Sequence, residues 1–228
     1  MAVLSPPFSI RENKTSRAAI RSRSKPAICE IDVSQSPQMA QFSKTVSKLC
    51  EVNYPKIKKI LISKSDPFEP PKRIQIVFKN NQADPGQALG STISLSSDWF
   101  TKYPKDLGAI VHEMAHVVQS YPPEQPAKQP FWLREGIADY IRYELGYQNE
   151  WSYPHCGPGS EHYTSGYWCS AAFLTYLVKK HDKDLVRKLN RSLRTNVYSE
   201  TLFQESTGQS LQQLWQQCLQ ETCAGGKP

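Results

Sequence analysis

The chain has 228 residues, enough for one domain with a tail, and its 39% hydrophobic content can build a substantial core. Its formal net charge is +7, but no basic stretch is interleaved with aromatic residues as a nucleic-acid stacking surface requires. No run of about 18 apolar residues is present, so no transmembrane segment is expected. We expect a monomer with a solvated basic face and no specific nucleic-acid partner.

The first residues read as a tail. Residues 1 to about 35 are rich in Ser, Pro, Arg and Lys without sustained periodicity, so we expect a basic, disordered tail over 1–35. Its short apolar stretch is broken by Pro6 and Pro7 and is followed by positive charges, which does not fit a signal peptide. A single domain is expected over 36–223, and a flexible C-terminus over 224–228.

Inside the domain we expect one helix, then several extended segments, and then a series of helices. Ser36-Pro37 is typical of a helix start, and apolar residues then recur at helical spacing to about residue 51. Extended segments are expected at 58–63, 73–79 and 92–96. Helices are expected at 106–120, 132–145, 167–180, 183–194 and 210–222, with a loop over 147–165. This order indicates an α+β fold, with a small twisted sheet packed on the helix at 106–120 and a helical C-terminal half.

Six cysteines form an even number without a CxxC pair: Cys29, Cys50, Cys156, Cys169, Cys218 and Cys223. Their dispersed spacing argues against a structural zinc site held by cysteines and is compatible with up to three disulfides. The local candidates are Cys156–Cys169 and Cys218–Cys223. The alternative is six reduced thiols in a reducing compartment.

The motif with the clearest chemistry is His112-Glu113-Met114-Ala115-His116 on the helix expected at 106–120. Histidines at i and i+4 project from one helix face and can share one metal ion. Glu113 lies beside that face, where it can take a proton from a water molecule attacking a carbonyl and pass it to the leaving amine. Zinc fits because it accepts imidazole and carboxylate ligands and keeps a fourth position for water. The motif therefore predicts a zinc-dependent peptidase.

The third ligand has two candidates on the next helix. A metzincin would have Gly at 119 and His at 122, where this chain has Gln119 and Pro122, so that pattern fails. Glu135 follows His116 by 19 residues, a separation typical of the gluzincins, in which a helical Glu completes the site. Asp139, one turn later, could then accept the ring N–H of a ligand histidine and fix its tautomer. The reverse assignment, with Asp139 as the ligand, resembles the aspzincin pattern and stays open.

Four segments together resemble a known family: HEMAHVVQ, WLREGIADYIR, GYWCSAAFLTYL and LFQESTGQSLQQLW. They are similar to the basic secretory protein family of plants and bacteria, which is regarded as zinc peptidases of the gluzincin type, and the likeness covers roughly residues 37–220. The resemblance implies a zincin-like metallopeptidase fold and a peptide or protein substrate. It implies Zn²⁺ held by His112, His116 and Glu135, with Glu113 as general base and Asp139 supporting a ligand.

The resemblance also bears on the oxyanion and on the location of the protein. Tyr167 matches the tyrosine of the family's GY segment and is our candidate for polarising the scissile carbonyl and stabilising the oxyanion. One of the histidines His155 and His162 could assist instead. A secreted location is implied by the family, although the chain departs from it in its leader, its basic tail and its Trp168-Cys169-Ser170 segment. The competing hypotheses are a non-catalytic zinc-containing defence or binding protein, and an intracellular zinc protease recruited to nucleic acid by the tail.

Overall fold

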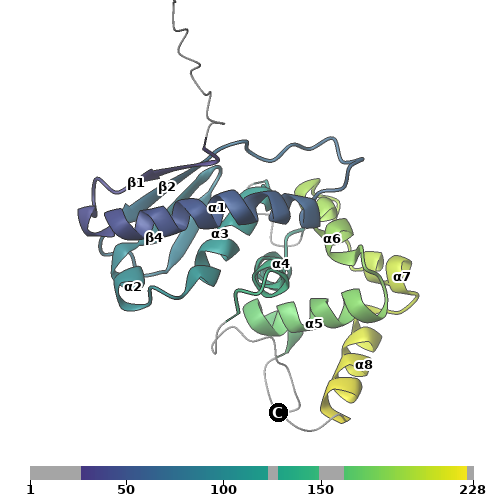
Figure 1. Ribbon diagram of the computed structural model, residues 1–228. Coiled ribbons are helices and arrows are strands. Elements are labelled where there is room, and N and C mark those ends of the chain that lie inside the picture. The colour runs from purple at the N-terminus through teal and green to yellow at the C-terminus, as the bar shows by residue number, and fades with distance from the viewer. Residues whose placement is uncertain (1–26, 123–127, 149–161, 225–228) are drawn as a thin grey trace, which may run out of the picture.

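The computed structural model describes residues 27–122, 128–148 and 162–224, and this part of the chain holds a four-stranded mixed sheet and eight α-helices (Figure 1). The strands are β1 (Cys29–Asp32), β2 (Ile74–Lys79), β3 (Gly86–Leu89) and β4 (Thr92–Ser96). The helices are α1 (Ala40–Leu61), α2 (Ser97–Lys102), α3 (Leu107–Gln119), α4 (Phe131–Glu144), α5 (Tyr167–Lys180), α6 (Leu185–Arg194), α7 (Thr201–Thr207) and α8 (Leu211–Ala224). The predicted α+β class is therefore confirmed.

The sheet has the order β1-β2-β4-β3, in which β1, β2 and β4 run parallel and β3 is antiparallel to β4. Ile74, Ile76 and Phe78 are fully buried on one face of β2, because alternate residues of a strand point to the same face of the sheet. In β4 the four residues from Ile93 to Ser96 are all buried, because the strand lies in the interior between β2 and β3. Among the described strands, β3 pairs only with β4 and is therefore the edge strand at this end of the sheet.

Several boundaries differ from the sequence prediction. The segment 58–63, expected to be a strand, is instead the last turn of α1 and the residues just after it, because Ile57 and Leu61 continue the buried face of that helix. Over so few residues, an apolar run does not distinguish a strand from a helix. The short elements β3, α2 and α7 were not predicted. The helices expected at 106–120, 132–145 and 167–180 agree with α3, α4 and α5 to within one residue.

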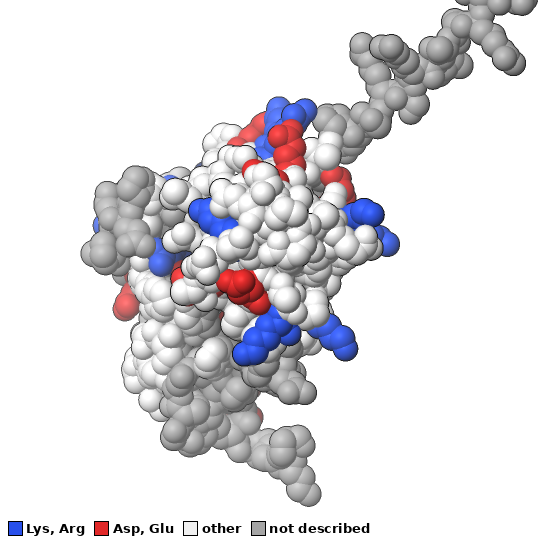
Figure 2. Space-filling view, turned by 90° about the vertical axis from the view of Figure 1, so that its left-hand side faces the viewer, with Lys and Arg blue, Asp and Glu red and all other residues white. Residues whose placement is uncertain are grey.

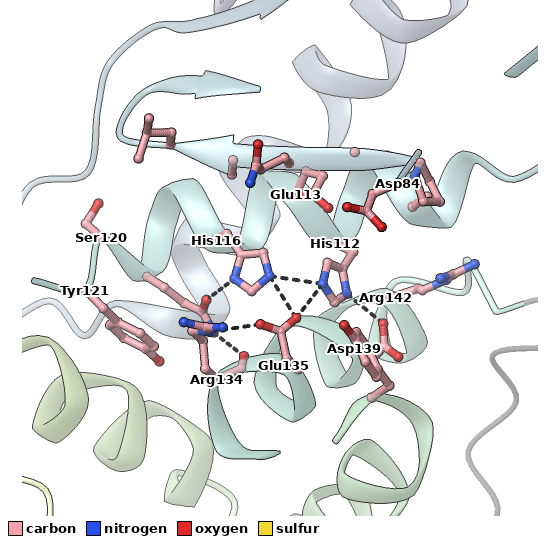
Figure 3. A pocket seen from close by; sticks show the side chains of 18 of the residues that line it. Asp84, His112, Glu113, His116, Ser120, Tyr121, Arg134, Glu135, Asp139 and Arg142 are labelled. Carbon is pink, nitrogen blue, oxygen red and sulfur yellow. Dashed lines mark hydrogen bonds and ion pairs between the residues drawn. The ribbon is translucent and has the colours of Figure 1, made fainter. Parts of the chain in front are cut away.

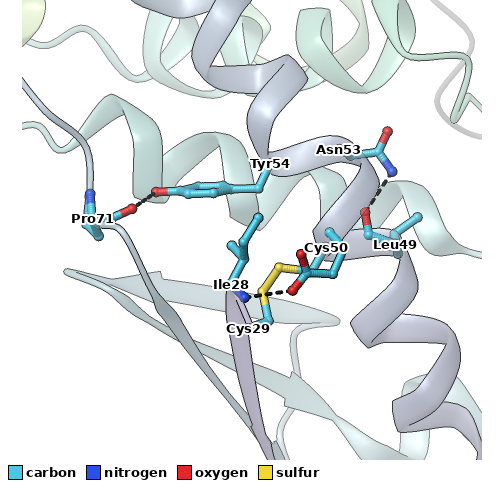
Figure 4. Close-up of a disulfide and its surroundings, with 8 residues drawn as sticks. Ile28, Cys29, Leu49, Cys50, Asn53, Tyr54 and Pro71 are labelled. Carbon is cyan, nitrogen blue, oxygen red and sulfur yellow. Dashed lines mark hydrogen bonds between the residues drawn. A yellow bond between two sulfur atoms is a disulfide. The ribbon is translucent and has the colours of Figure 1, made fainter. Parts of the chain in front are cut away.

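The sheet includes a strand that lies before residue 36, where the domain was expected to begin. Residues 29–32 form β1, which pairs with β2, and Cys29 forms a disulfide with Cys50 in α1 (Figure 4). The backbone N–H of Ile28 donates a hydrogen bond of 2.7 Å to the carboxylate of Glu51. A segment of four residues is too short to show the alternating pattern by which a strand is recognised. The disulfide that holds this strand in place reaches Cys50 in another element.

The other cysteine predictions concern residues only partly described. Cys169 is in a disulfide. Cys156 and the side chain of Cys223, which belong to the two expected local pairs, lie outside the described residues. The expected loop over 147–165 is described only at its ends, where Tyr163–Ser165 form a 3-10 turn.

The two halves of the domain meet along α3 and α4. In Figure 1, α1 and α3 run across the sheet, and α4 lies between α3 and α5. Helices α4 and α5 approach closely at Gly136, where a Cβ atom would lie 2.5 Å from Cβ of Ser170. This close approach fixes α4, which carries Glu135 and Asp139, between α3 and α5.

The surface and the helices give two further observations. On the face shown in Figure 2, Lys and Arg side chains are scattered among acidic and uncharged residues and form no continuous basic patch. Within the described ranges, no helix has both the length and the apolar character needed to cross a membrane.

Candidate metal centre

Helix α3 presents the HExxH motif from a buried position. Its first turn is fixed through Asp106, whose carboxylate accepts hydrogen bonds from Arg142 Nη2 at 2.6 Å and from Trp99 Nε1 at 3.1 Å. His112 and His116 then lie one turn apart on the side of the helix that faces α4 (Figure 3). The ion pair between Asp106 and Arg142 therefore links the start of α3 to the end of α4.

Three side-chain atoms from these two helices converge on one point (Figure 3). His112 Nε2 lies 3.0 Å from His116 Nε2 and 3.2 Å from Glu135 Oε2. His116 Nε2 lies 3.3 Å from the same carboxylate oxygen. These three residues could hold a metal ion, since each offers one ligand atom to the shared point.

The second nitrogen of each ring is held by an acceptor. His112 Nδ1 lies 2.7 Å from Asp139 Oδ1, and His116 Nδ1 lies 2.6 Å from Gln119 Oε1. Gln119 Nε2 donates to the backbone carbonyl of Arg134 at 2.9 Å, which orients the amide with its oxygen towards His116. Because a carboxylate and an amide oxygen accept hydrogen bonds, the Nδ1 atoms of the neutral rings carry the protons. The lone pairs of both Nε2 atoms then face the shared point.

The charges around this point favour a cation. Burial opposes a charge on His112, but attraction by Asp139, hydrogen bonds to Asp139 and Glu135, and the charge of Glu113 together raise its pKa to about 10. Burial acts to raise the pKa of Glu135, but His112 and His116 in their protonated form donate hydrogen bonds to it and attract its charge, and together these effects hold the pKa well below its ordinary value. Buried carboxylates thus create a negative potential where the histidine nitrogens meet.

Glu113 lies against the edge strand. A Cβ atom at position 86 would come within 2.6 Å of Glu113 Cγ and 3.2 Å of its Oε1 atom. The carboxylate is therefore placed directly beside β3, on the wall of the cleft that also contains His112 and His116 (Figure 3). Glycine at position 86 is what permits this approach.

Tyr167 also reaches the cleft. Its ring stacks on that of His112, with centroids 6.1 Å apart and an interplanar angle of 29°. Partial burial raises the pKa of its phenol, and the charges of Glu135, Asp139 and Asp84 raise it further, so the hydroxyl group remains a hydrogen-bond donor at neutral pH. The described histidine of the loop, His162, packs on aromatic rings away from the cleft lining. His155 lies outside the described residues.

One cleft of about 1060 Å³ brings all six predicted site residues together: His112, Glu113, His116, Glu135, Asp139 and Tyr167. Sequence reasoning missed three further lining residues, namely Asp84, Gly86 and Gln119 as a partner of His116. Arg134 also lines the cleft, and its Nε donates to Glu135 Oε1 at 2.8 Å. Helical spacing could have identified Gln119, which follows His116 by three residues. The others depend on how β3 and α4 fold around α3.

Comparison with known proteins gives one match. A family model described as peptidase of plants and bacteria matches residues 56–218, more than two thirds of the chain. No curated protein and no solved structure matches the chain. The matched range runs from α1 to α8 and includes all six residues predicted for the site. The chain therefore belongs to this peptidase family of plants and bacteria, as its resemblance to the basic secretory proteins predicted.

Proposed function

We propose that this protein is a zinc-dependent peptidase of zincin-like architecture, with His112, His116 and Glu135 as the metal ligands. The observation that carries the proposal is the convergence of their three ligand atoms at separations of 3.0, 3.2 and 3.3 Å in a chain of a peptidase family. Nitrogen and oxygen ligands of a tetrahedral zinc ion lie about 2.0–2.1 Å from the metal and hence about 3.3 Å from each other. The donor set thus fits zinc and leaves the fourth position for water.

Glu135 is the better candidate for the third ligand. Its Oε2 atom lies near Nε2 of both histidines, whereas the nearest oxygen of Asp139 lies at Nδ1, on the far side of the His112 ring. Asp139 is then the residue that fixes the tautomer and orientation of His112. Gln119 does the same for His116.

The catalytic steps follow from the residues around this point. Zinc, when bound, supplies a Lewis acid that polarises the scissile carbonyl and lowers the pKa of a water molecule. Glu113 takes a proton from the attacking water and passes it to the leaving amine, which splits the peptide bond. Tyr167 donates a hydrogen bond to the oxyanion that develops on the former carbonyl oxygen.

The substrate is a peptide segment in extended form. Within the described sheet, strand β3 is paired with β4 alone and so is an edge strand, and its four residues line the cleft that contains Glu113. An extended peptide can pair with such an edge through main-chain hydrogen bonds, which brings its carbonyls past the reactive centre. The disulfide between Cys29 and Cys50 supports an oxidising, extracellular location for this activity.

The first test separates catalysis from metal binding. A peptide library is digested with the wild type and with Glu113→Gln, and the zinc content of both proteins is measured. Loss of the general base lowers kcat by about 10²–10⁴-fold, while zinc remains at one ion per chain. Cleavage by Glu113→Gln at the wild-type rate, with zinc retained, would rule out the mechanism.

The second test decides the third ligand. Glu135→Ala is expected to abolish stoichiometric zinc binding, because two histidines alone do not complete the donor set. Asp139→Ala is expected to keep zinc with an affinity reduced about 10–100-fold, since it removes only the partner of His112. The opposite pattern would show that Asp139 is the ligand.

A further inference from the structure

We propose that the cleft selects peptides with a large apolar side chain, above all an aromatic one, directly beside the scissile bond. The side chain is recognised by an aromatic wall formed by Phe131, Tyr167 and Trp168. This inference rests on the proposed peptidase function and names the substrate class of the same site.

The first observation is where exposed apolar side chains occur. In the described part of the chain, five large hydrophobic residues are exposed: Val52, Leu89, Phe131, Tyr167 and Val197. Leu89, Phe131 and Tyr167, with 82%, 48% and 41% of their surfaces exposed, all line the cleft that contains His112 and Glu113. Apolar surface gathered at a concave site marks a place where a ligand supplies the missing contacts.

The second observation is that the aromatic wall is held in place by its own contacts. The ring of Phe131 meets that of Tyr167 edge-on at 5.6 Å, and the Tyr167 ring stacks near that of Trp168 at 6.5 Å. A Cβ atom on Gly166 would lie 2.8 Å from the Phe131 ring, so glycine at this position makes room for it. The backbone of Tyr167 has a φ of 46°, a left-handed conformation that tyrosine rarely adopts. A wall ordered in advance loses little freedom when it binds a side chain.

The third observation is the distance from the wall to the reactive centre. The Tyr167 ring lies 6.1 Å from the ring of His112, and the Phe131 ring lies 5.6 Å from that of Tyr167. An extended peptide advances about 3.3 Å per residue, so a side chain that flanks a scissile bond held beside His112 is within reach of the wall, which begins at Tyr167. Leu89 extends the apolar lining on the β3 side of the cleft.

The charges of the cleft agree with this selection. Asp84 is exposed in the lining, so acidic substrate side chains are repelled beside it. The guanidinium group of Arg134 lies 5.7 Å from the ring centroid of Phe131. Arg134 therefore covers part of the Phe131 ring, and the remaining surface of the ring is open to a ligand. The favoured side chain is therefore uncharged and apolar.

The test uses peptides that differ only at the residue flanking the cleavage site, with Phe, Leu, Ala or Glu there. The wild type is expected to prefer Phe over Ala by at least about tenfold in kcat/KM, as apolar pockets discriminate by roughly 10–200-fold per group. Phe131→Ala should lower this ratio several-fold, and Phe131→Leu should retain most of the preference for apolar residues. Val197→Ala is the matched control, because it removes an exposed apolar side chain outside the cleft lining and should leave the ratio unchanged.

A second readout separates this proposal from the peptidase proposal. The same peptides are titrated against zinc-loaded Glu113→Gln protein, with and without Phe131→Ala. If the wild type cleaves none of the peptides, the peptidase proposal fails, and tighter binding of the Phe peptide that depends on Phe131 still supports the aromatic wall. An unchanged Phe-to-Ala ratio in Phe131→Ala, in both cleavage and binding, overturns the proposal. So does a wild-type dimer that Phe131→Ala converts to a monomer, because the wall would then be a self-association surface.

Discussion

Replacing Gly86 by alanine tests whether the edge strand positions Glu113. A Cβ atom at residue 86 would lie 2.6 Å from Glu113 Cγ and 3.1 Å from Cδ, whereas ordinary contact begins near 3.4 Å. Either β3 or the Glu113 side chain must therefore move by about 0.8 Å, and a displacement of about 1 Å at a catalytic group can cost roughly 10²-fold in rate. We expect kcat/KM to fall by about 10²-fold in Gly86→Ala.

The same experiment carries its own control. Gly208, at the end of α7 and outside the cleft lining, has a φ of +78° and no atom within 4 Å of a Cβ placed there. Gly208→Ala therefore strains the backbone without touching the cleft, and it should lower the thermal midpoint while leaving kcat/KM near the wild-type value. Cleavage of a wild-type substrate peptide, zinc content and thermal unfolding are measured for both variants.

The comparison has a clear contrary outcome. If Gly86→Ala cleaves peptides as fast as the wild type, β3 yields without cost and does not position Glu113. If Gly86→Ala loses its zinc, the collision has displaced His112 and His116 as well, and the reasoning from Glu113 alone is wrong.

Three further predictions concern the support of the fold and the site. Replacing both Cys29 and Cys50 by Ser removes their disulfide, which closes a loop of 21 residues. The free energy of unfolding, measured in urea, should fall by about 3 kcal/mol because the unfolded chain is no longer constrained. A loss below about 1 kcal/mol would contradict this. Asp66→Ala should cost about 3–5 kcal/mol in the same assay, because its partner Arg194 is buried and would be left uncompensated; near-native stability would refute the burial argument. Gln119→Ala should weaken zinc binding about 10–100-fold in a competition titration with a chromogenic chelator; unchanged affinity would show that His116 is oriented without it.

The parts of the fold that could be predicted are those in which apolar residues recur at helical spacing over several turns. Helices α3, α4 and α5 each carry 13 or 14 residues, enough for the helical pattern to be recognised. Strands β1 and β3 have four residues each and are defined by their partners in the sheet. Their assignment depends on tertiary pairing, and neither of these short segments shows a pattern of its own.

The candidate site divides in the same way. Residues related by helical spacing, such as His112 with His116 and Glu135 with Asp139, could be predicted, because one turn of helix places them on one face. The order of α3 and α4 was enough to suggest that the two pairs meet. The contact of Gly86 with Glu113 joins elements whose relation is set by the packing of β3 on α3, and no spacing in the sequence encodes it.

Helices α3 and α4 are joined at both ends by contacts that involve no metal. Arg142 near the end of α4 binds Asp106 at the start of α3, and Gln119 at the end of α3 donates to the carbonyl of Arg134 near the start of α4. The candidate metal ligands His112, His116 and Glu135 lie between these two contacts, so the protein can fold first and bind its metal ion afterwards. The free energy of metal binding then appears as affinity and as added stability of the loaded form, and is not consumed in assembling the site. If the protein is the zinc peptidase proposed above, zinc supply would control the active fraction without controlling how much of the protein is folded.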